Sequence, residues 1–279
     1  MQTITISSKG QSWGQYLKEL AHYRDLFITF AIRDFKVKYA QTFLGFFWAL
    51  FQQIVAIGVF SLIRYAAFDN ENDSIPVVLY ISAGIAAWTY FDFVVNNSAN
   101  SIILSGSMIK KIYFPRLILP LSKALVGLID YLIGLLLLAL MFMVYGMFPS
   151  SNIIFLPLFI LSTILAALGL GIWVSALTIR FRDFQHIVPF LLKIGMFITP
   201  VYFSAEQLIE RTPLRWQPIT QVLFYLNPMA GNIEAMKWSL FYSQPLDPMT
   251  GISFGVSAIL FFTGLFYFKK SEKQMADLV

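Results

Sequence analysis

Residues 121–147 read LSKALVGLIDYLIGLLLLALMFMVYGM and contain only two charged side chains, Lys123 and Asp130. A helix of about 20 apolar residues crosses the roughly 30 Å hydrocarbon core of a bilayer, and this run is longer than that. Strands of a transmembrane barrel alternate apolar and polar residues, and no such alternation occurs here. The stretch therefore predicts a membrane-spanning helix.

The rest of the chain repeats this apolar pattern. Of its 279 residues, 58% are hydrophobic and 13% are charged, which would leave large exposed apolar patches on a soluble protein. Five more runs are long and apolar: Phe43–Ile63, Ile75–Val95, Ile153–Ile179, Ile187–Phe203 and Ile252–Phe268. We therefore expect one all-α integral membrane domain over residues 1–279, with six transmembrane helices.

Two further patterns concern the N-terminal segment and the fourth run. Residues 12–38 begin with a capping box, Ser12 and Gln15, and carry an apolar face. This predicts an amphipathic helix that lies on the cytoplasmic face of the membrane instead of crossing it. The small residues at 166–171, AALGLG, are expected to let helices pack closely.

The loop over residues 204–248 contains two apolar pieces, Ile219–Leu226 and Ile233–Phe241, that are too short to cross a bilayer. Asn227-Pro228 separates them, and proline disfavours a helical conformation at the residue before it. We expect a re-entrant or interfacial helical hairpin on the outer side of the membrane, with Tyr225 and Trp238 near the interface.

The positions of the cations predict the orientation, because lysine and arginine concentrate in loops that stay in the cytoplasm. Most of the 20 such residues fall in segments that six spans would place on one side: the N-terminal segment, residues 106–123, Arg180, Arg182, Lys269, Lys270 and Lys273. The acidic stretch 69–74 falls on the other side. We expect a multi-pass protein of the cytoplasmic (inner) membrane with both termini in the cytoplasm. The net charge of +5 is then explained by topology and anionic lipids, and no nucleic-acid binding is expected.

Few residues could carry chemistry. The chain has no cysteine, and its two histidines, His22 and His186, are far apart in sequence, so we expect no metal site. It has no phosphate-binding GxxxxGK[ST] loop, so we expect neither a catalytic residue nor a bound cofactor. Asp92, Asp130 and Lys193 lie inside spans without forming a relay. For the two aspartates, a structural contact or a place beside a water-filled cavity is favoured over direct substrate contact.

Residues 106–123 read GSMIKKIYFPRLILPLSK, a basic segment between two apolar runs. We expect about two turns of helix over Met108–Phe114, ended by Pro115, with apolar and cationic side chains on its surface. So short a helix is not stable alone, so it needs a membrane surface or a protein socket, and the residues themselves favour neither.

Four segments together carry a resemblance: RDFKVKYAQTFLGFFWALFQQ at 33–53, KKIYFPRLILPLSK at 110–123, RDFQHIVPFLLKIGMFITPVYF at 182–203 and YLNPM at 225–229. This order and spacing resemble the membrane subunit of ABC-2 type exporters, most closely the branch that exports lipid-linked polysaccharides such as O-antigen, capsule or teichoic acid chains. The resemblance implies a homodimer with two separate ATPase subunits, which bind ATP and Mg²⁺. It makes residues 106–116 a coupling helix that docks on the ATPase through Ile109, Lys110, Lys111, Ile112, Tyr113, Phe114, Pro115 and Arg116.

The same resemblance implies a glycan tunnel lined partly by aromatic side chains, on which sugar C–H faces pack. The candidates are Trp88, Tyr90 and Phe91 in the second span, and Tyr202 and Phe203 at the outer end of the fifth. We interpret the latter pair, together with the outer hairpin, as a gate that closes when no glycan is present.

Three other functions remain possible from the sequence. An ABC-2 exporter of small drugs or lipids shares the architecture. The aromatic-rich path and the FPRLILP motif at 114–120 favour a polysaccharide as the substrate. An integral membrane transferase would need a base beside a carboxylate or metal cluster, and the one acidic cluster, Asp69, Glu71 and Asp73, has no partner base in its short loop. A purely structural scaffold is disfavoured by the coupling segment.

Overall fold

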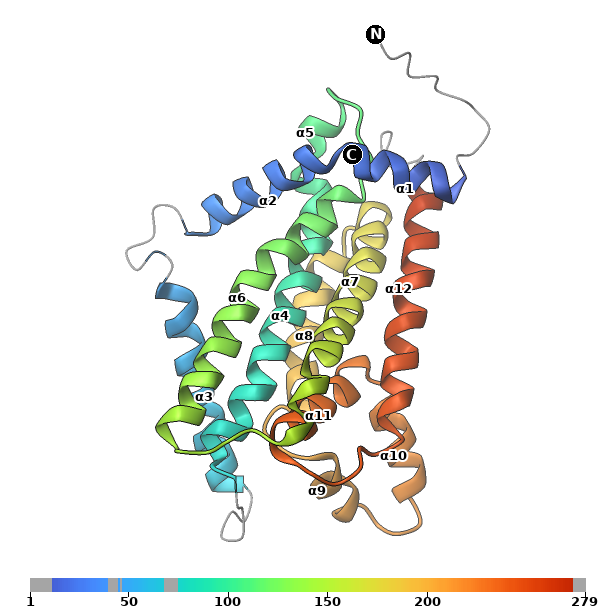
Figure 1. Cartoon of the computed structure of the whole chain (residues 1–279). Coiled ribbons are helices and arrows are strands. Elements are labelled where there is room, and N and C mark those ends of the chain that lie inside the picture. Colours follow the sequence, from blue (N-terminus) through green and yellow to red (C-terminus); the bar gives the residue numbers. More distant parts are fainter. Residues whose placement is uncertain (1–11, 40–44, 46, 68–74, 273–279) are drawn as a thin grey trace.

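A computed structural model describes residues 12–39, 45, 47–67 and 75–272, and these residues contain helices and no strand. The elements are α1 Trp13–His22, α2 Arg24–Tyr39, α3 Phe47–Ala67, α4 Val77–Leu104, α5 Gly106–Ile109, α6 Ile118–Val144, η1 Ser151–Phe155, α7 Leu156–Arg180, α8 Phe184–Ile198, α9 Ala205–Glu210, α10 Gln217–Tyr225, α11 Pro228–Phe241 and α12 Thr250–Glu272. The acidic cluster Asp69, Glu71 and Asp73 lies outside the described residues. Figure 1 shows the long helices as a bundle, with α5 at one end and α9 and α10 at the other.

Five of the helices in the described ranges, α3, α4, α6, α7 and α12, are long and apolar enough to cross a membrane. The expected span from Ile187 to Phe203 is shorter than the sequence predicted, because α8 has 15 residues and ends at Ile198. Its length is about 22 Å, less than the roughly 30 Å of a hydrocarbon core. The helix stops there because Pro200 disfavours a helical conformation at Thr199, whose backbone is extended.

The centre of the bundle is α4, which packs against α3, α6, α7, α8 and α11 and is buried over most of its length. Next to it, α7 and α12 approach each other through glycines, as the small-residue run predicted. A Cβ atom added at Gly169 would lie 2.7 Å from the backbone nitrogen of Phe261, and one at Gly264 would lie 2.9 Å from the carbonyl oxygen of Gly169. The absence of side chains at these two positions is what lets the backbones touch.

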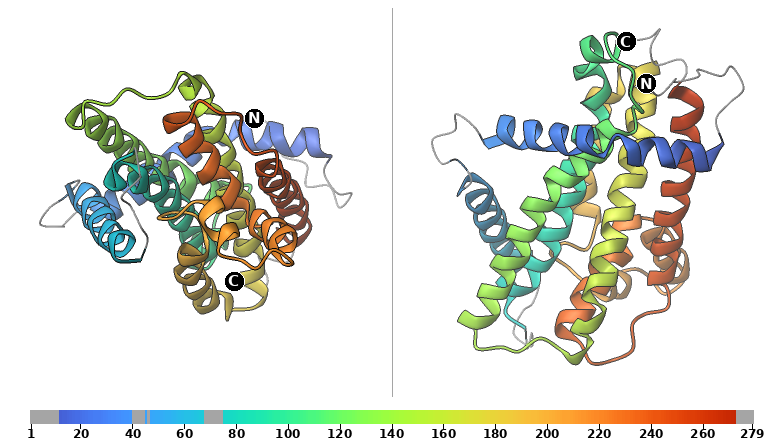
Figure 2. Two further views of the ribbon diagram at one scale, coloured as in Figure 1. Left: turned by 90° about the horizontal axis from the view of Figure 1, so that it is seen from below. Right: turned by 45° about the horizontal axis from the view of Figure 1, so that its top comes forward.

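The N-terminal segment forms two helices, where the sequence predicted one over residues 12–38. The capping box is present, since the side chains of Ser12 and Gln15 accept hydrogen bonds from each other's backbone N–H groups. A turn at Tyr23 separates α1 from α2. Both helices lie across the α5 end of the bundle, as Figures 1 and 2 show. Trp13 of α1 meets the ring of Phe266 of α12 with centroids 4.8 Å apart.

At the opposite end, α10 and α11 meet at Asn227-Pro228, as the sequence predicted. The side chain of Asn227 accepts a hydrogen bond from the backbone N–H of Met229 and caps α11. Met229, Ile233 and Met236 of α11 are completely buried, and α11 packs against α4, α7 and α12. The re-entrant or interfacial position of the hairpin stays a prediction. Figure 2 views this end from below, with α11 among the ends of the long helices. Of these two helices, α10 exposes apolar side chains, those of Ile219, Val222 and Leu223.

A pair of glycine substitutions tests the contact between α7 and α12. Gly169→Ala should lower the thermal unfolding midpoint in detergent, since overpacking of this kind costs about 1–3 kcal/mol. Gly255→Ala in α12 has nothing within 4 Å of the added Cβ, and alanine is favoured over glycine in a helix by about 1 kcal/mol. It should leave the midpoint unchanged or raise it. Equal midpoints for the two variants would contradict this description of the interface.

Candidate coupling surface and substrate path

The segment from α5 to Arg116 is not the two-turn helix that the sequence predicted over Met108–Phe114. The helix α5 ends at Ile109, a hydrogen-bonded turn follows it, and residues 113–115 are not helical. Two causes act together. Pro115 disfavours a helical conformation at Phe114, and the ring of Phe114 turns inward to meet the ring of Phe30 in α2, with centroids 5.5 Å apart.

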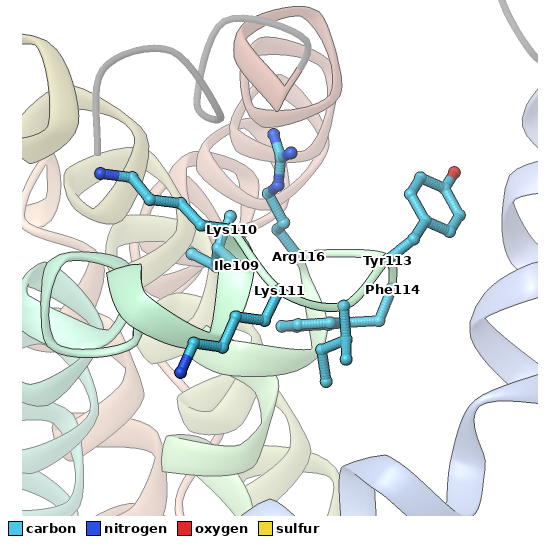
Figure 3. A pocket seen from close by; sticks show the side chains of 7 residues that line it. Ile109, Lys110, Lys111, Tyr113, Phe114 and Arg116 are labelled. Carbon is cyan, nitrogen blue, oxygen red and sulfur yellow. The ribbon is translucent and has the colours of Figure 1, made fainter.

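This segment divides its side chains between the core and the surface. Ile109 and Phe114 are 7% and 3% exposed and belong to the core cluster at this end of the bundle. Ile112 and Tyr113 are 47% and 57% exposed. Lys110 and Lys111 are also exposed, Arg116 is half-buried and Pro115 is buried. Figure 3 shows Tyr113 on one side of the segment and the two lysines on the other, around a shallow cavity of about 210 Å³.

The segment is attached to the N-terminal and C-terminal helices. The backbone N–H of Arg116 donates to Oε1 of Glu272 in α12 at 2.6 Å, and its guanidinium donates to the carbonyl oxygen of the same residue. Partial burial, and next the carboxylate of Glu19 in α1, raise the pKa of Tyr113 to about 12. The exposed surface therefore rests on α1 and α12.

The second feature is a stripe of polar side chains along the central helix. Thr89, Asp92, Asn96 and Asn100 are three or four residues apart, so they share one face of α4, and Asn97 lies beside Asn96 at the edge of that face. These residues are partly exposed, although most of α4 is buried. This spacing of polar residues within an apolar run can be seen in the sequence. The sequence analysis instead predicted that the neighbouring aromatic residues line the path.

Those aromatic candidates pack inside the chain. Trp88, Tyr90 and Phe91 are at most 5% exposed. The ring of Tyr90 stacks on Tyr131 of α6 with centroids 5.1 Å apart, and Trp88 packs against Gly195 of α8. These three side chains occupy the core between α4 and its neighbours.

A cavity of about 400 Å³ lies beside the stripe, between α2, α3, α4 and α6. Its lining residues are Lys38, Ala49, Gln52, Gln53, Ala56, Thr89, Asp92, Phe93, Asn96, Asn97 and Asp130. The Asp130 carboxylate accepts hydrogen bonds from the ammonium of Lys38 and the hydroxyl of Tyr39, and its carbonyl oxygen accepts one from Gln53 at 2.8 Å. Asp130 therefore has structural partners and also lines a cavity. The sequence analysis favoured these two roles over direct contact with substrate.

The third feature is the turn between α8 and α9, whose carbonyl groups are held by two buried cations. The ammonium of Lys237 donates to the carbonyl oxygens of Pro200 and Phe203, the second at 3.1 Å. The guanidinium of Arg64 donates to the carbonyl oxygen of Tyr202 at 2.9 Å. Both cations are buried, with Lys237 0% and Arg64 4% exposed.

Tyr80 of α4 lies between these cations. Lys237 is 3.7 Å and Arg64 is 4.7 Å from the centre of its ring, and its hydroxyl donates to the carbonyl oxygen of Phe203 at 3.2 Å. Burial lowers the pKa of Lys237, and the carboxylate of Glu234 opposes that shift. We call Arg64, Tyr80 and Lys237 the turn clamp.

The turn clamp positions the two aromatic residues that the sequence proposed as a gate. Phe203 is buried, and the half-buried ring of Tyr202 stacks on Phe60 of α3 with centroids 5.6 Å apart. The turn also lies directly on α4, because a Cβ atom at Gly84 would be 2.6 Å from the carbonyl oxygen of Val201. Residues from α3, α4 and α11 thus hold one short turn in place.

A family model and two named relatives match this chain, and all of them are transporter proteins. A family model described as ABC-2 type transporter matches residues 25–241. A relative from Myxococcus xanthus, named O-antigen export system permease protein RfbA, is 25% identical over 266 residues, which are 94% of this chain and 98% of the relative. A protein of the same name from Klebsiella pneumoniae is 26% identical over 264 residues, covering 93% of this chain and 97% of that protein.

Removing the charge of the turn clamp tests its contribution. Lys237→Met keeps a long side chain but removes the donor to the carbonyl oxygen of Pro200 and leaves that of Phe203 with Tyr80 alone. A buried unsatisfied polar group costs about 1–3 kcal/mol. We expect a lower thermal midpoint in detergent and faster proteolysis within residues 199–205. Lys36→Met changes an exposed lysine of α2 and should alter neither. Unchanged proteolysis of Lys237→Met would show that the clamp does not hold the turn.

Proposed function

Because this chain belongs to the ABC-2 type transporter family, we propose that it is the permease subunit of an ATP-driven exporter of a lipid-linked polysaccharide. Relatives named as O-antigen export permeases align over nearly its whole length, so the likeness is not confined to one segment. The glycan would be of the O-antigen, capsule or teichoic acid type. The chain itself would conduct the substrate and catalyse no reaction.

The polar stripe of α4 is the observation that carries this proposal. A polar side chain inside hydrocarbon is costly, so intramembrane polar groups face a protein interior or a water-filled space. In the single chain, Thr89, Asp92 and Asn96 are partly open on one side. We infer that a second copy of the chain covers this face and that the glycan passes between the two. A drug or lipid exporter would be expected to present an apolar wall here.

The arrangement of the ends supports a six-crossing topology. Both α7 and α12 end at the α5 end of the bundle, while α9 lies at the opposite end, so α8 and the turn after it carry the chain across (Figure 1). The described cations of α1, α2 and the α5 segment gather at the α5 end. By the tendency of cations to remain in the cytoplasm, we place that end, and both termini, in the cytoplasm. The helices α9 to α11 would then form a partly re-entrant outer structure in the inner membrane.

Energy would come from a partner. The chain has no nucleotide-binding loop, so ATP and Mg²⁺ would bind to two separate ATPase subunits. Tyr113, Ile112 and the two lysines before them offer an apolar and cationic docking surface at the proposed cytoplasmic end. Its attachment to α1 and α12 would pass movement of the ATPase to the bundle.

Two neighbouring aromatic residues separate docking from stability. Tyr113→Ala should reduce co-purification of the ATPase while the thermal midpoint stays unchanged, because this side chain is 57% exposed. Phe114→Ala removes a buried ring, which typically costs about 3–5 kcal/mol, and should lower the midpoint. The matched control is Phe148→Ala, which changes a ring that is 92% exposed outside the α5 segment. The coupling assignment is wrong if Tyr113→Ala leaves ATPase binding, hydrolysis and export intact.

The outer aromatic residues are proposed to close the path between export cycles, which would protect ion gradients. Tyr202→Ala should therefore raise ion flux through glycan-free proteoliposomes that contain the assembled exporter. Tyr65→Ala, which truncates a tyrosine of α3 that is 57% exposed, serves as the control and should not change the flux. Equal flux through both variants, with normal amounts of complex, would leave the turn with a structural role alone.

A further inference from the structure

The cavity beside α4 is rich in hydrogen-bond acceptors. Its lining includes four side-chain amides, Gln52, Gln53, Asn96 and Asn97, and the hydroxyl of Thr89. The wall of the cavity also contains apolar groups, which belong to two alanines and the ring of Phe93. A mixture of amide groups and C–H surfaces matches the two kinds of surface that a sugar ring presents, hydroxyl groups at its edge and C–H groups on its faces.

The helix itself orients some of these amides. The Nδ2 group of Asn97 donates to the carbonyl oxygen of Phe93 at 2.7 Å, and that of Asn100, one turn further, donates to the carbonyl oxygen of Asn96 at 3.3 Å. Each bond uses an amide N–H inside α4. Of these two residues, Asn97 lines the cavity, and its Oδ1 atom is then a group that a hydroxyl donor from a ligand can approach.

The charges of the cavity are matched in pairs. The Asp130 carboxylate is bonded to the ammonium of Lys38, which also lies 3.8 Å from the centre of the Phe93 ring. Asp92 is close enough to Lys193 of α8 to interact with it electrostatically. Both lysines are thus already close to a carboxylate. A pyrophosphate group in the cavity would meet two carboxylates, and like charges at close range repel. A neutral, hydroxylated ligand meets no such repulsion.

We propose that this cavity is a saccharide subsite, in which hydroxyl groups of the glycan donate to the side chains of Asp92, Asn96 and Asn97. The proposal rests on the proposed function and adds that the sugar chain, and not the pyrophosphate of its lipid carrier, occupies this part of the path. A neutral hydrogen bond contributes only about 0.5–1.5 kcal/mol net, so single contacts here can break and re-form while the glycan slides.

Photo-crosslinking tests the subsite in the assembled exporter. The photoreactive residue p-benzoylphenylalanine replaces Asn96, in cells that make their own lipid-linked glycan, and the permease is purified after irradiation. We expect a high-mass smear of permease that stains for vicinal diols by periodate oxidation and hydrazide labelling. The same residue at Phe262, which is 59% exposed on α12, is the control and should give no such smear.

The outcomes distinguish the subsite from the proposed function. If export proceeds but the probe at 96 attaches only to phospholipid or to a second copy of the chain, the subsite is wrong and the permease role stands. If the unsubstituted chain with its ATPase exports no glycan, the proposed function itself fails. A second variant, Asn96→Leu with Asn97→Leu, should lose export while its thermal midpoint and ATPase binding are retained. Normal export by that variant would also overturn the subsite.

Discussion

The burial of α4 is the constraint on which the rest of this structure depends. A helix in hydrocarbon satisfies its own backbone hydrogen bonds, but its polar side chains still need a partner or water. In α4 the apolar and aromatic faces pack against α6, α7 and α8, while Thr89, Asp92 and the asparagines share the remaining face. One helix thus organises the core of the chain and supplies the polar wall of the proposed path.

Each end of the bundle contains a short non-helical segment that is held by residues distant in sequence. At the α5 end, Phe114 is buried and Arg116 is bonded to Glu272, so Tyr113 projects from a fixed base. At the other end the turn clamp holds the carbonyl groups of residues 200–203. Phe114 shares a core cluster with Ile102 of α4, and Tyr80 of the turn clamp also belongs to α4, so the surface proposed for the ATPase and the proposed outer gate both contact this helix.

Much of the fold follows from patterns that are local in the chain. Length and hydropathy predict the long apolar helices, because a run of this kind has few other stable states in a bilayer. The capping box at Ser12, the break at Asn227-Pro228 and the close contact at Gly169 also follow from local rules. The chain alone likewise indicated its family, from the order and spacing of several basic and proline-containing segments.

The assignment of individual residues depended on tertiary structure. Periodicity shows which side chains share a face of a helix, but only the neighbouring helices decide whether that face meets protein, lipid or a cavity. That is why Tyr90 is a core residue while Asn96 lines the cavity, and why adjacent Phe114 and Tyr113 differ in exposure. The burial of Lys237 could not be predicted from its local sequence, because its acceptors, the carbonyl groups of Pro200 and Phe203, lie more than 30 residues earlier in the chain. Sequence determined the long apolar helices and their order, and packing determined what each side chain touches.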